Sequence, residues 1–289
     1  MLALSSQEAV LASIAQAREV SCSAFILRPG RLLNALESAA AGGAEVRVRL
    51  DGFTFGDERG RLAANQAAVD ELRTYGADAA LGDPAGPPLH LKSVVADGKL
   101  FLDDRNWPGG GRDTILALDG RDEIEAVGST LAGVPAQTAD LATVKGSALA
   151  LEASTIAAGA GDAVECESES FGSGSVCAAL RLRAEGGAHV RLLVDRKVNG
   201  AERRALRTLA GAGVEVRVGG SAEKIALAGD RAWIGSANAT SAAPGTLDWG
   251  LRTADGAIVG ALRGRFEEEW AAGRPFALGS DNAAAVPSR

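Results

Sequence analysis

A ten-residue segment that begins at residue 42 recurs at residue 186, and this repeat restricts the possible folds more than any other feature of the sequence. Residues 42–51 read GGAEVRVRLD and residues 186–195 read GGAHVRLLVD, so six of the ten pairs are identical at a shift of 144 (186 − 42). The same shift aligns Cys22 with Cys166, Gly30 with Gly174 and Leu36 with Leu180. A constant shift over this length indicates an internal duplication.

Each copy alternates predicted strands and helices. In the first copy we predict strands at 20–27, 46–50 and near Ala79, and helices at 5–18, 29–41 and 64–75. At the end of the second copy we predict a helix over 261–272 that packs on the sheet. This alternation is typical of an α/β layered sheet. The 289 residues suit two half-domains of about 140 residues each. We therefore predict a first half over residues 1–140, a second half over residues 141–278 and a loose tail over residues 279–289.

A short motif in the first copy carries side chains suited to phosphate chemistry. His90 and Lys92 precede a predicted hairpin whose turn is Asp97-Gly98, with Asn106 after the second strand. Strand alternation places His90 and Lys92 on the same face. An imidazole beside an ammonium group can attack a phosphorus centre and stabilise the charge on its oxygens.

The duplication predicts a second motif, and the sequence contains a degenerate one. Lys224 to Asn238 aligns with Lys92 to Asn106 without a gap, at a shift of 132 (224 − 92). Residues 235–238 read GSAN, which includes Ser236. Ala222, however, stands at the position equivalent to His90, and Gly229 stands at the position equivalent to Asp97.

These residues resemble the motif of the phospholipase D superfamily, which is His-x-Lys, four residues, Asp, and then Gly-Ser-x-Asn. The resemblance covers roughly residues 14–276, although Asp103-Asp104-Arg105 stands where the first motif would have Gly-Ser-x. It implies a duplicated phospholipase D-like fold of the α/β class. In that fold two α/β sandwich halves are related by a pseudo-twofold axis, and the two motifs face each other across one cleft.

The resemblance also implies roles for individual residues. In this family one His attacks the phosphodiester and becomes phosphohistidine, the other His protonates the leaving oxygen, and no metal or other cofactor takes part. His90 is then the nucleophile, in a catalytic group with Lys92, Asp97 and Asn106. The residues expected to bind substrate are Lys224, Ser236 and Asn238. We expect Asp113 to hold the far nitrogen of His90.

The missing second His leaves the general acid unassigned. The chain has one other histidine, His189, which the repeat places at a strand entrance far from the cleft. Losing a general acid costs roughly two to four orders of magnitude in rate. The sequence thus leaves two functions open: a phospholipase D-like phosphodiesterase, catalysing hydrolysis or phosphatidyl transfer, or a catalytically impaired pseudoenzyme that binds a phosphorylated ligand or partner.

Composition limits the substrate without choosing it. The net charge of −7 argues against broad nucleic-acid binding, and an aromatic content of 4% argues against a base-stacking surface. The sequence contains no apolar segment long enough to span a membrane and no secretory signal. We expect a cytoplasmic protein without integral membrane association, acting on a phospholipid or nucleic-acid phosphodiester. It would be a monomer or a homodimer, and in the homodimer two intact halves could meet.

One acidic pattern lies outside the motifs. Glu165, Glu167 and Glu169 alternate along a predicted strand. Alternating carboxylates on one strand face are typical of a solvated surface. We therefore predict that these three side chains face water.

Overall fold

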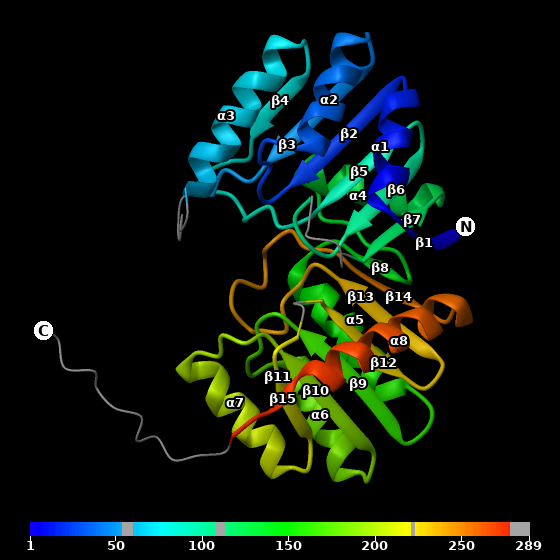
Figure 1. Cartoon of the computed structure of the whole chain (residues 1–289), viewed down its shortest axis with the longest axis vertical. Helices are drawn as coiled ribbons and strands as arrows, with labels where there is room; N and C mark the ends of the chain where they lie inside the picture. Colours follow the sequence, from blue (N-terminus) through cyan, green and yellow to red (C-terminus); the bar gives the residue numbers. More distant parts are fainter. Residues whose placement is uncertain (54–59, 108–113, 221–222, 278–289) are drawn as a thin grey trace, which may run out of the picture.

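The computed structural model describes residues 1–53, 60–107, 114–220 and 223–277, and within these it contains two mixed β-sheets, one in each half of the chain (Figure 1). The first sheet has the order β1-β7-β6-β5-β2-β3-β4. Its strands are β1 (Leu2–Ser5), β2 (Glu19–Ala24), β3 (Glu45–Leu50), β4 (Asp78–Leu81), β5 (Ser93–Ala96), β6 (Lys99–Asp103) and β7 (Ile115–Leu118).

The second sheet has the order β15-β11-β10-β9-β12-β13-β14-β8. Its strands are β8 (Leu141–Ala142), β9 (Ala163–Ser168), β10 (His189–Val194), β11 (Glu215–Val218), β12 (Ile225–Ala228), β13 (Arg231–Gly235), β14 (Gly250–Thr253) and β15 (Arg274–Pro275). The first strand of this sheet in the chain, β8, thus begins at Leu141.

The two sheets repeat the same topology. In the first, β2, β3 and β4 run parallel, and β5 joins β2 antiparallel. In the second, β9, β10 and β11 run parallel, and β12 joins β9 antiparallel. The shift is 144 between β2 and β9 (163 − 19) and 132 between β5 and β12 (225 − 93), as the sequence repeat requires. The predicted duplicated α/β fold is confirmed.

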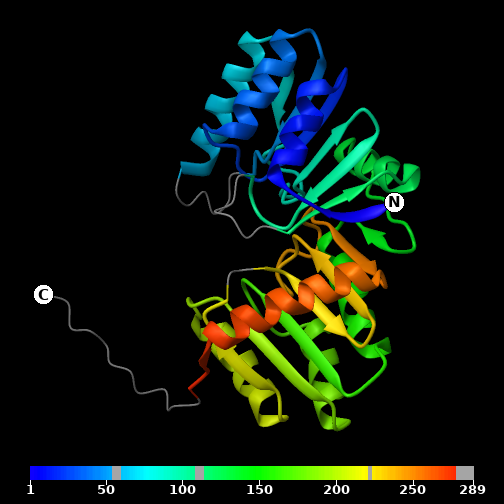
Figure 2. The ribbon, with the colours of Figure 1, turned by 45° about the vertical axis from the view of Figure 1, so that its right-hand side comes forward.

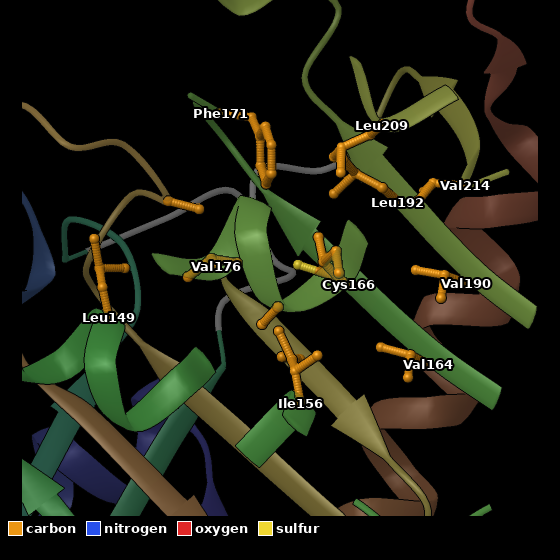
Figure 3. Packing of buried hydrophobic residues seen from close by; sticks show 14 of the residues in the cluster. Leu149, Ile156, Val164, Cys166, Phe171, Val176, Val190, Leu192, Leu209 and Val214 are labelled. Carbon is orange, nitrogen blue, oxygen red and sulfur yellow. The ribbon is translucent and has the colours of Figure 1, made fainter. Parts of the chain in front are cut away.

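Each sheet has helices on both of its faces (Figures 1 and 2). The helices are α1 (Gln7–Gln16), α2 (Arg31–Ala41), α3 (Arg61–Thr74), α4 (Arg121–Leu131), α5 (Lys145–Ala158), α6 (Ser175–Glu185), α7 (Gly200–Gly211) and α8 (Gly256–Ala272). Helices α1, α2 and α3 pack on the first sheet, and α5, α6 and α7 pack on the second. Figure 3 shows this outer core of the second half, where Cys166 of β9 and Leu192 of β10 face Ile156, Val176 and Leu209 from the helices.

A third apolar cluster joins the two halves. It combines leucines of β6 and β7 with residues of β12, β13 and β14 and with the buried faces of α4 and α8. Leu102, Leu193, Trp249 and Leu262 are all completely buried in this cluster or nearly so. The two halves therefore share one core, and neither sheet could expose this face without placing large apolar side chains in water.

Two boundaries differ from the sequence prediction. The motif strand begins at Ser93, so His90 and Lys92 lie in the segment before β5 and outside the strand that their alternation suggested. Helix α8 begins at Gly256, where Asp255 accepts hydrogen bonds from the first backbone amides, and it is longer than the predicted 261–272. Among the described residues, no helix has both the length and the apolar character that crossing a membrane requires.

The shared core predicts a large cost for removing a buried side chain of α8. Leu262→Ala removes a side chain with no exposed area between the sheets, and it should lower the free energy of unfolding by about 2–5 kcal/mol. Urea unfolding measures this change. The matched control is Leu182→Ala on α6, a leucine that is 63% exposed, which should stay within about 0.5 kcal/mol of the parent. Equal losses in the two variants would contradict the shared core.

Candidate active site

The segment that carries His90 is held by both halves of the chain. Its neighbour Leu89 forms a parallel bridge with Leu247 of the second half. The amide of Leu247 donates to the carbonyl of Pro88 at 2.9 Å, and the amide of His90 donates to the carbonyl of Leu247 at 2.8 Å. From the first half, the buried carboxylate of Asp51 accepts the amide of Leu89 at 2.6 Å. The position of His90 therefore depends on how the halves are docked.

A carboxylate of the second half orients the imidazole. Nδ1 of His90 lies 2.6 Å from Oδ1 of Asp248, which is 1% exposed. The hydroxyl of Ser236 donates to the same oxygen at 2.8 Å and accepts the amide of Trp249 at 2.9 Å. Burial raises the pKa of Asp248, but His90, Lys92 and Ser236 together hold it below its ordinary value. An ionised carboxylate only accepts, so the proton of the imidazole resides on Nδ1 and Nε2 carries a lone pair.

Lys92 lies against that lone pair. Its Nζ is 2.7 Å from Nε2 of His90, and the side chain is 1% exposed. Burial lowers the pKa of Lys92 to about 7, and the charge of Lys224 lowers it too, against the opposing effect of Asp248. Burial also holds the pKa of His90 below its ordinary value, and the charge of Lys92 adds to this effect. His90 is thus neutral at physiological pH, the state in which an imidazole is a nucleophile.

Lys224 brings a second ammonium group from the degenerate motif. It is 2% exposed, forms an ion pair with Oε2 of Glu169 at 3.3 Å, and donates to the carbonyl of Asp104 at 3.4 Å. Its charge lowers the pKa of both His90 and Lys92, because all three groups face the same region. The ring of Phe25 packs edge-on against His90, with 5.0 Å between the ring centroids. The site therefore combines one neutral imidazole with two buried lysines from different halves, a combination suited to a phosphate group.

Asp97, which the sequence grouped with the catalytic residues, lies at the turn after β5, at the opposite end of that strand from Lys92. Its carboxylate accepts the amides of Arg18 and Glu19 at 2.9–3.1 Å and so fixes the start of β2. Asp97 has a φ of 45°, and its equivalent Gly229 has a φ of 63°. A side chain at Gly229 would collide with the carbonyl of Ala160. The two copies thus fill one left-handed turn position in different ways, and this position serves the hairpin.

The remaining predicted residues follow the second strand of each hairpin. Ser236, expected to bind phosphate, instead holds Asp248 and the amide of Trp249. Its equivalent Asp104 accepts the amide of Thr114 at 2.9 Å, so a carboxylate does in one copy what a hydroxyl does in the other. Asn106 and Asn238 each have a buried amide oxygen without a hydrogen-bond partner in the described structure. Such a group costs about 1–3 kcal/mol unless a ligand or water satisfies it.

The carboxylate on His90 is not the predicted one. Asp113 and Ala222 lie outside the described residues. In the structure it is Asp248 that contacts Nδ1 of His90. Asp248 and Asp113 occupy equivalent places after their motifs, so the signal was in the sequence. The prediction missed Asp248 because it assumed that a carboxylate from the same half orients each His. His189 begins β10 at the surface and pairs with Glu215 at 3.5 Å, remote from this site as predicted.

Of the three glutamates predicted to face water, Glu169 is exposed, whereas Glu165 and Glu167 are buried. Glu165 and Glu167 are 4% and 1% exposed, and Glu165 pairs with Arg191 and Arg263. Helix α8 packs against β9, and its Arg263 is one of the partners of Glu165. Glu169 follows the strand and reaches Lys224. The prediction failed for Glu165 and Glu167 because α8 comes from the far end of the sequence.

A cavity of about 670 Å³ adjoins the site in the second half. It is lined by Asn238 of the degenerate motif, by Ser170 next to Glu169, and by Asn199 and Arg204 from the start of α7. Lys145 also lines it and donates to Thr240 and to the carbonyl of Ala242, both at 2.8 Å. Most of the side chains that line it are polar or charged, and Phe171 and three alanines add apolar surface.

Solved structures share the fold of this chain. The chain is similar to polyphosphate kinase from Porphyromonas gingivalis, with a TM-score of 0.67 and 15% identity over 93% of this chain and 50% of the kinase. It therefore spans about half the length of that enzyme. Partial matches include Nuc, a phospholipase D family member from Salmonella typhimurium (19% identity, 44% of this chain, 89% of Nuc, TM-score 0.42). NucT from Helicobacter pylori matches likewise (18% identity, 47% of this chain, 97% of NucT, TM-score 0.42).

A scan against protein-family models and a search of curated proteins gave no match. The likeness to the kinase shows the fold, a duplicated phospholipase D-like architecture in two α/β halves.

The His90–Asp248 pair predicts the direction of a titration. Asp248→Asn removes the negative charge that raises the pKa of His90, so the pKa of His90 should fall further below its ordinary value. The chain has two histidines, so NMR titration of the imidazole Cε1–H signals, assigned with His189→Gln, measures this directly. Glu215→Gln, which removes the partner of His189, is the control and should leave the His90 signal unchanged. An unchanged or higher midpoint in Asp248→Asn would refute the pairing.

Proposed function

We propose that the protein is a metal-independent phosphodiesterase of the phospholipase D type, in which Nε2 of His90 attacks the phosphorus. The observation that carries this proposal is the contact of His90 with Asp248 at 2.6 Å. It fixes the proton on Nδ1, leaves Nε2 as the nucleophile, and places a negative charge beside the imidazolium that attack creates.

The two lysines supply the electrostatic part of the reaction. In the free protein Nζ of Lys92 is hydrogen-bonded to Nε2 of His90 at 2.7 Å, so the lone pair of Nε2 is engaged. A bound phosphodiester offers Lys92 and Lys224 anionic oxygens, so Lys92 turns from His90 to the phosphate and releases the nucleophile. Attack then forms the P–N bond of phosphohistidine while the bond from phosphorus to the leaving oxygen breaks and the leaving group departs. The two ammonium groups stabilise the charge that develops on the non-bridging oxygens. Water hydrolyses this intermediate and restores His90.

The alternative is a pseudoenzyme that binds a phosphorylated ligand through the same lysines. Ala222 in place of a second His favours it, and so does the Asp103-Asp104 pair in place of Gly-Ser. Both the phosphodiesterase and the pseudoenzyme require an anion site at Lys92 and Lys224. They differ in whether His90 becomes phosphorylated.

Turnover of an activated diester separates these functions. Bis(p-nitrophenyl) phosphate has a leaving group acidic enough to depart without a general acid, so we expect hydrolysis in EDTA that His90→Ala abolishes. His189→Ala is the matched control and should keep full activity, because that imidazole lies at the surface on β10. A phosphohistidine trapped by acid-free quench and mass spectrometry should map to His90. Absence of turnover and of adduct, with tungstate binding intact, would establish the pseudoenzyme.

The polar cavity beside Asn238 would hold the rest of the substrate. Its charged side chains, Lys145 and Arg204 among them, favour a hydrophilic substituent over an acyl chain. Thymidine 5′-(p-nitrophenyl phosphate) and p-nitrophenyl phosphorylcholine carry the same leaving group on a nucleoside and on a lipid headgroup. Their relative kcat/KM values decide between the two substrate classes.

The pKa of Lys92 predicts how anion binding depends on pH. The ammonium form binds an oxyanion, and Lys92 loses it as the pH rises through about 7. Affinity for tungstate, measured by calorimetry, should therefore be highest below pH 7 and fall by about tenfold per pH unit above it, the slope for uptake of one proton. Lys92→Arg keeps its charge throughout this range and should remove the slope. The same slope in both proteins would show that another group titrates.

A further inference from the structure

The proposed reaction needs a proton on the leaving oxygen, and the chain has no second histidine at its cleft. Ala222 stands at the position equivalent to His90, and His189 is at the surface. An unactivated alkoxide leaves slowly unless it is protonated. A general acid that protonates it raises the rate by roughly two to four orders of magnitude. The inference that follows rests on the proposed function and names the group that supplies this proton.

We propose that Glu169 is the general acid, replacing the second histidine. Its carboxylate lies 3.3 Å from Nζ of Lys224, the lysine of the second motif, directly after β9. A phosphate bound between Lys92 and Lys224 would have His90 on the first-half side and Glu169 on the second-half side. This is the arrangement that in-line displacement requires, with nucleophile and acid on opposite sides of the phosphorus.

The internal symmetry supports this placement independently. At the shift of 144, Glu169 is equivalent to Phe25 (169 − 25). Phe25 packs edge-on against the imidazole of His90, with 5.0 Å between the centroids. Under the pseudo-twofold, a side chain at position 169 is directed to the place where the second copy of that imidazole would stand. The second half has Ala222 in place of the His of its motif. At the position where the first half has Phe25, which packs against its His, the second half has the carboxyl group of Glu169.

The other carboxyl groups described near the site are buried and hydrogen-bonded within the protein, and among them Asp103 and Asp104 accept the amides of Arg105 and Thr114. Asp248 accepts from His90 and Ser236. Glu223 is 2% exposed, accepts from Thr114 at 3.3 Å and pairs with Arg265 at 3.6 Å, away from the lysines. The side chain of Glu169, in contrast, is 46% exposed, so it can exchange its proton with water between turnovers.

The charge of the site explains when Glu169 would carry that proton. Burial raises the pKa of Glu169, but Lys224, His90 and Lys92 together hold it below its ordinary value, so it is ionised in the free protein. A bound phosphodiester neutralises Lys224 and adds a nearby negative charge, and both changes raise the pKa of the carboxyl group. Substrate binding would thus draw one proton from solvent onto Glu169.

The two steps then balance. In the first, Nε2 of His90 forms a bond to phosphorus, the bond from phosphorus to the leaving oxygen breaks, and protonated Glu169 gives its proton to that oxygen. In the second, a water molecule attacks the phosphohistidine and transfers its proton to the Glu169 carboxylate, and the P–N bond breaks. His90 leaves as the neutral imidazole, and Glu169 is again protonated until product departs.

Dependence on the leaving group tests this role. Glu169→Gln keeps the shape and removes the proton, so it should lower kcat on diphenyl phosphate by about 10²–10⁴-fold and on bis(p-nitrophenyl) phosphate by less than about tenfold. Glu169→Asp should recover part of the lost activity. The matched control is Glu267→Gln, which removes another half-exposed carboxylate from an ion pair, with Arg191, away from the cleft. It should be neutral on both substrates.

Each other outcome has a definite meaning. Equal losses on the two substrates, or a change confined to KM, would show that Glu169 only positions Lys224, and would overturn its role as the acid. Undiminished activity of Glu169→Gln on diphenyl phosphate would overturn it as well. If the parent protein hydrolyses neither substrate and forms no phosphohistidine, the proposed function itself fails. Urea unfolding of each variant separates loss of chemistry from loss of fold.

Discussion

The hydrogen bond between His90 and Asp248 joins the two halves and brings a buried carboxylate to the candidate nucleophile. A carboxylate that is 1% exposed is stable inside a protein only when several donors compensate its lost hydration. Asp248 obtains one donor from its own half, Ser236, and one from the other half, His90. Separation of the halves would leave it without the second. The state in which His90 is oriented is therefore also the state in which the halves are docked, and the apolar cluster between the sheets stabilises both.

The duplication supplied two equal copies, and the differences between them follow local structural requirements. At the hairpin turn, Asp97 has room for a side chain that holds the start of β2, whereas the carbonyl of Ala160 leaves room only for Gly229. After the second hairpin strand, Asp104 and Ser236 accept equivalent backbone amides with different groups. A motif position can thus change its residue type while keeping its structural task, so a mismatch to the family pattern does not by itself indicate a lost site.

The sequence predicts well what depends on local pattern and on the repeat. The constant shifts predict two sheets with the same strand order, and the spacing of His90 and Lys92 places the two side chains together, although the strand begins only at Ser93. It predicts poorly what depends on contacts across the halves. Asp113 was chosen because it is near His90 in the chain, and the structure instead brings Asp248 from 158 residues away. Glu165 and Glu167 look solvated until α8, a hundred residues later, covers them.

The exchange of residues across the halves changes what a degenerate motif means. Because the carboxylate that orients His90 belongs to the second half, that half remains necessary for the first motif even though its own sequence has Ala222 in place of a histidine. The second half keeps three residues around His90: Asp248 contacts its Nδ1, Ser236 holds Asp248, and Lys224 brings a second positive charge close to the imidazole. Their retention in one cluster around the surviving His90 fits a site in which the first half provides the nucleophile and the second provides its surroundings.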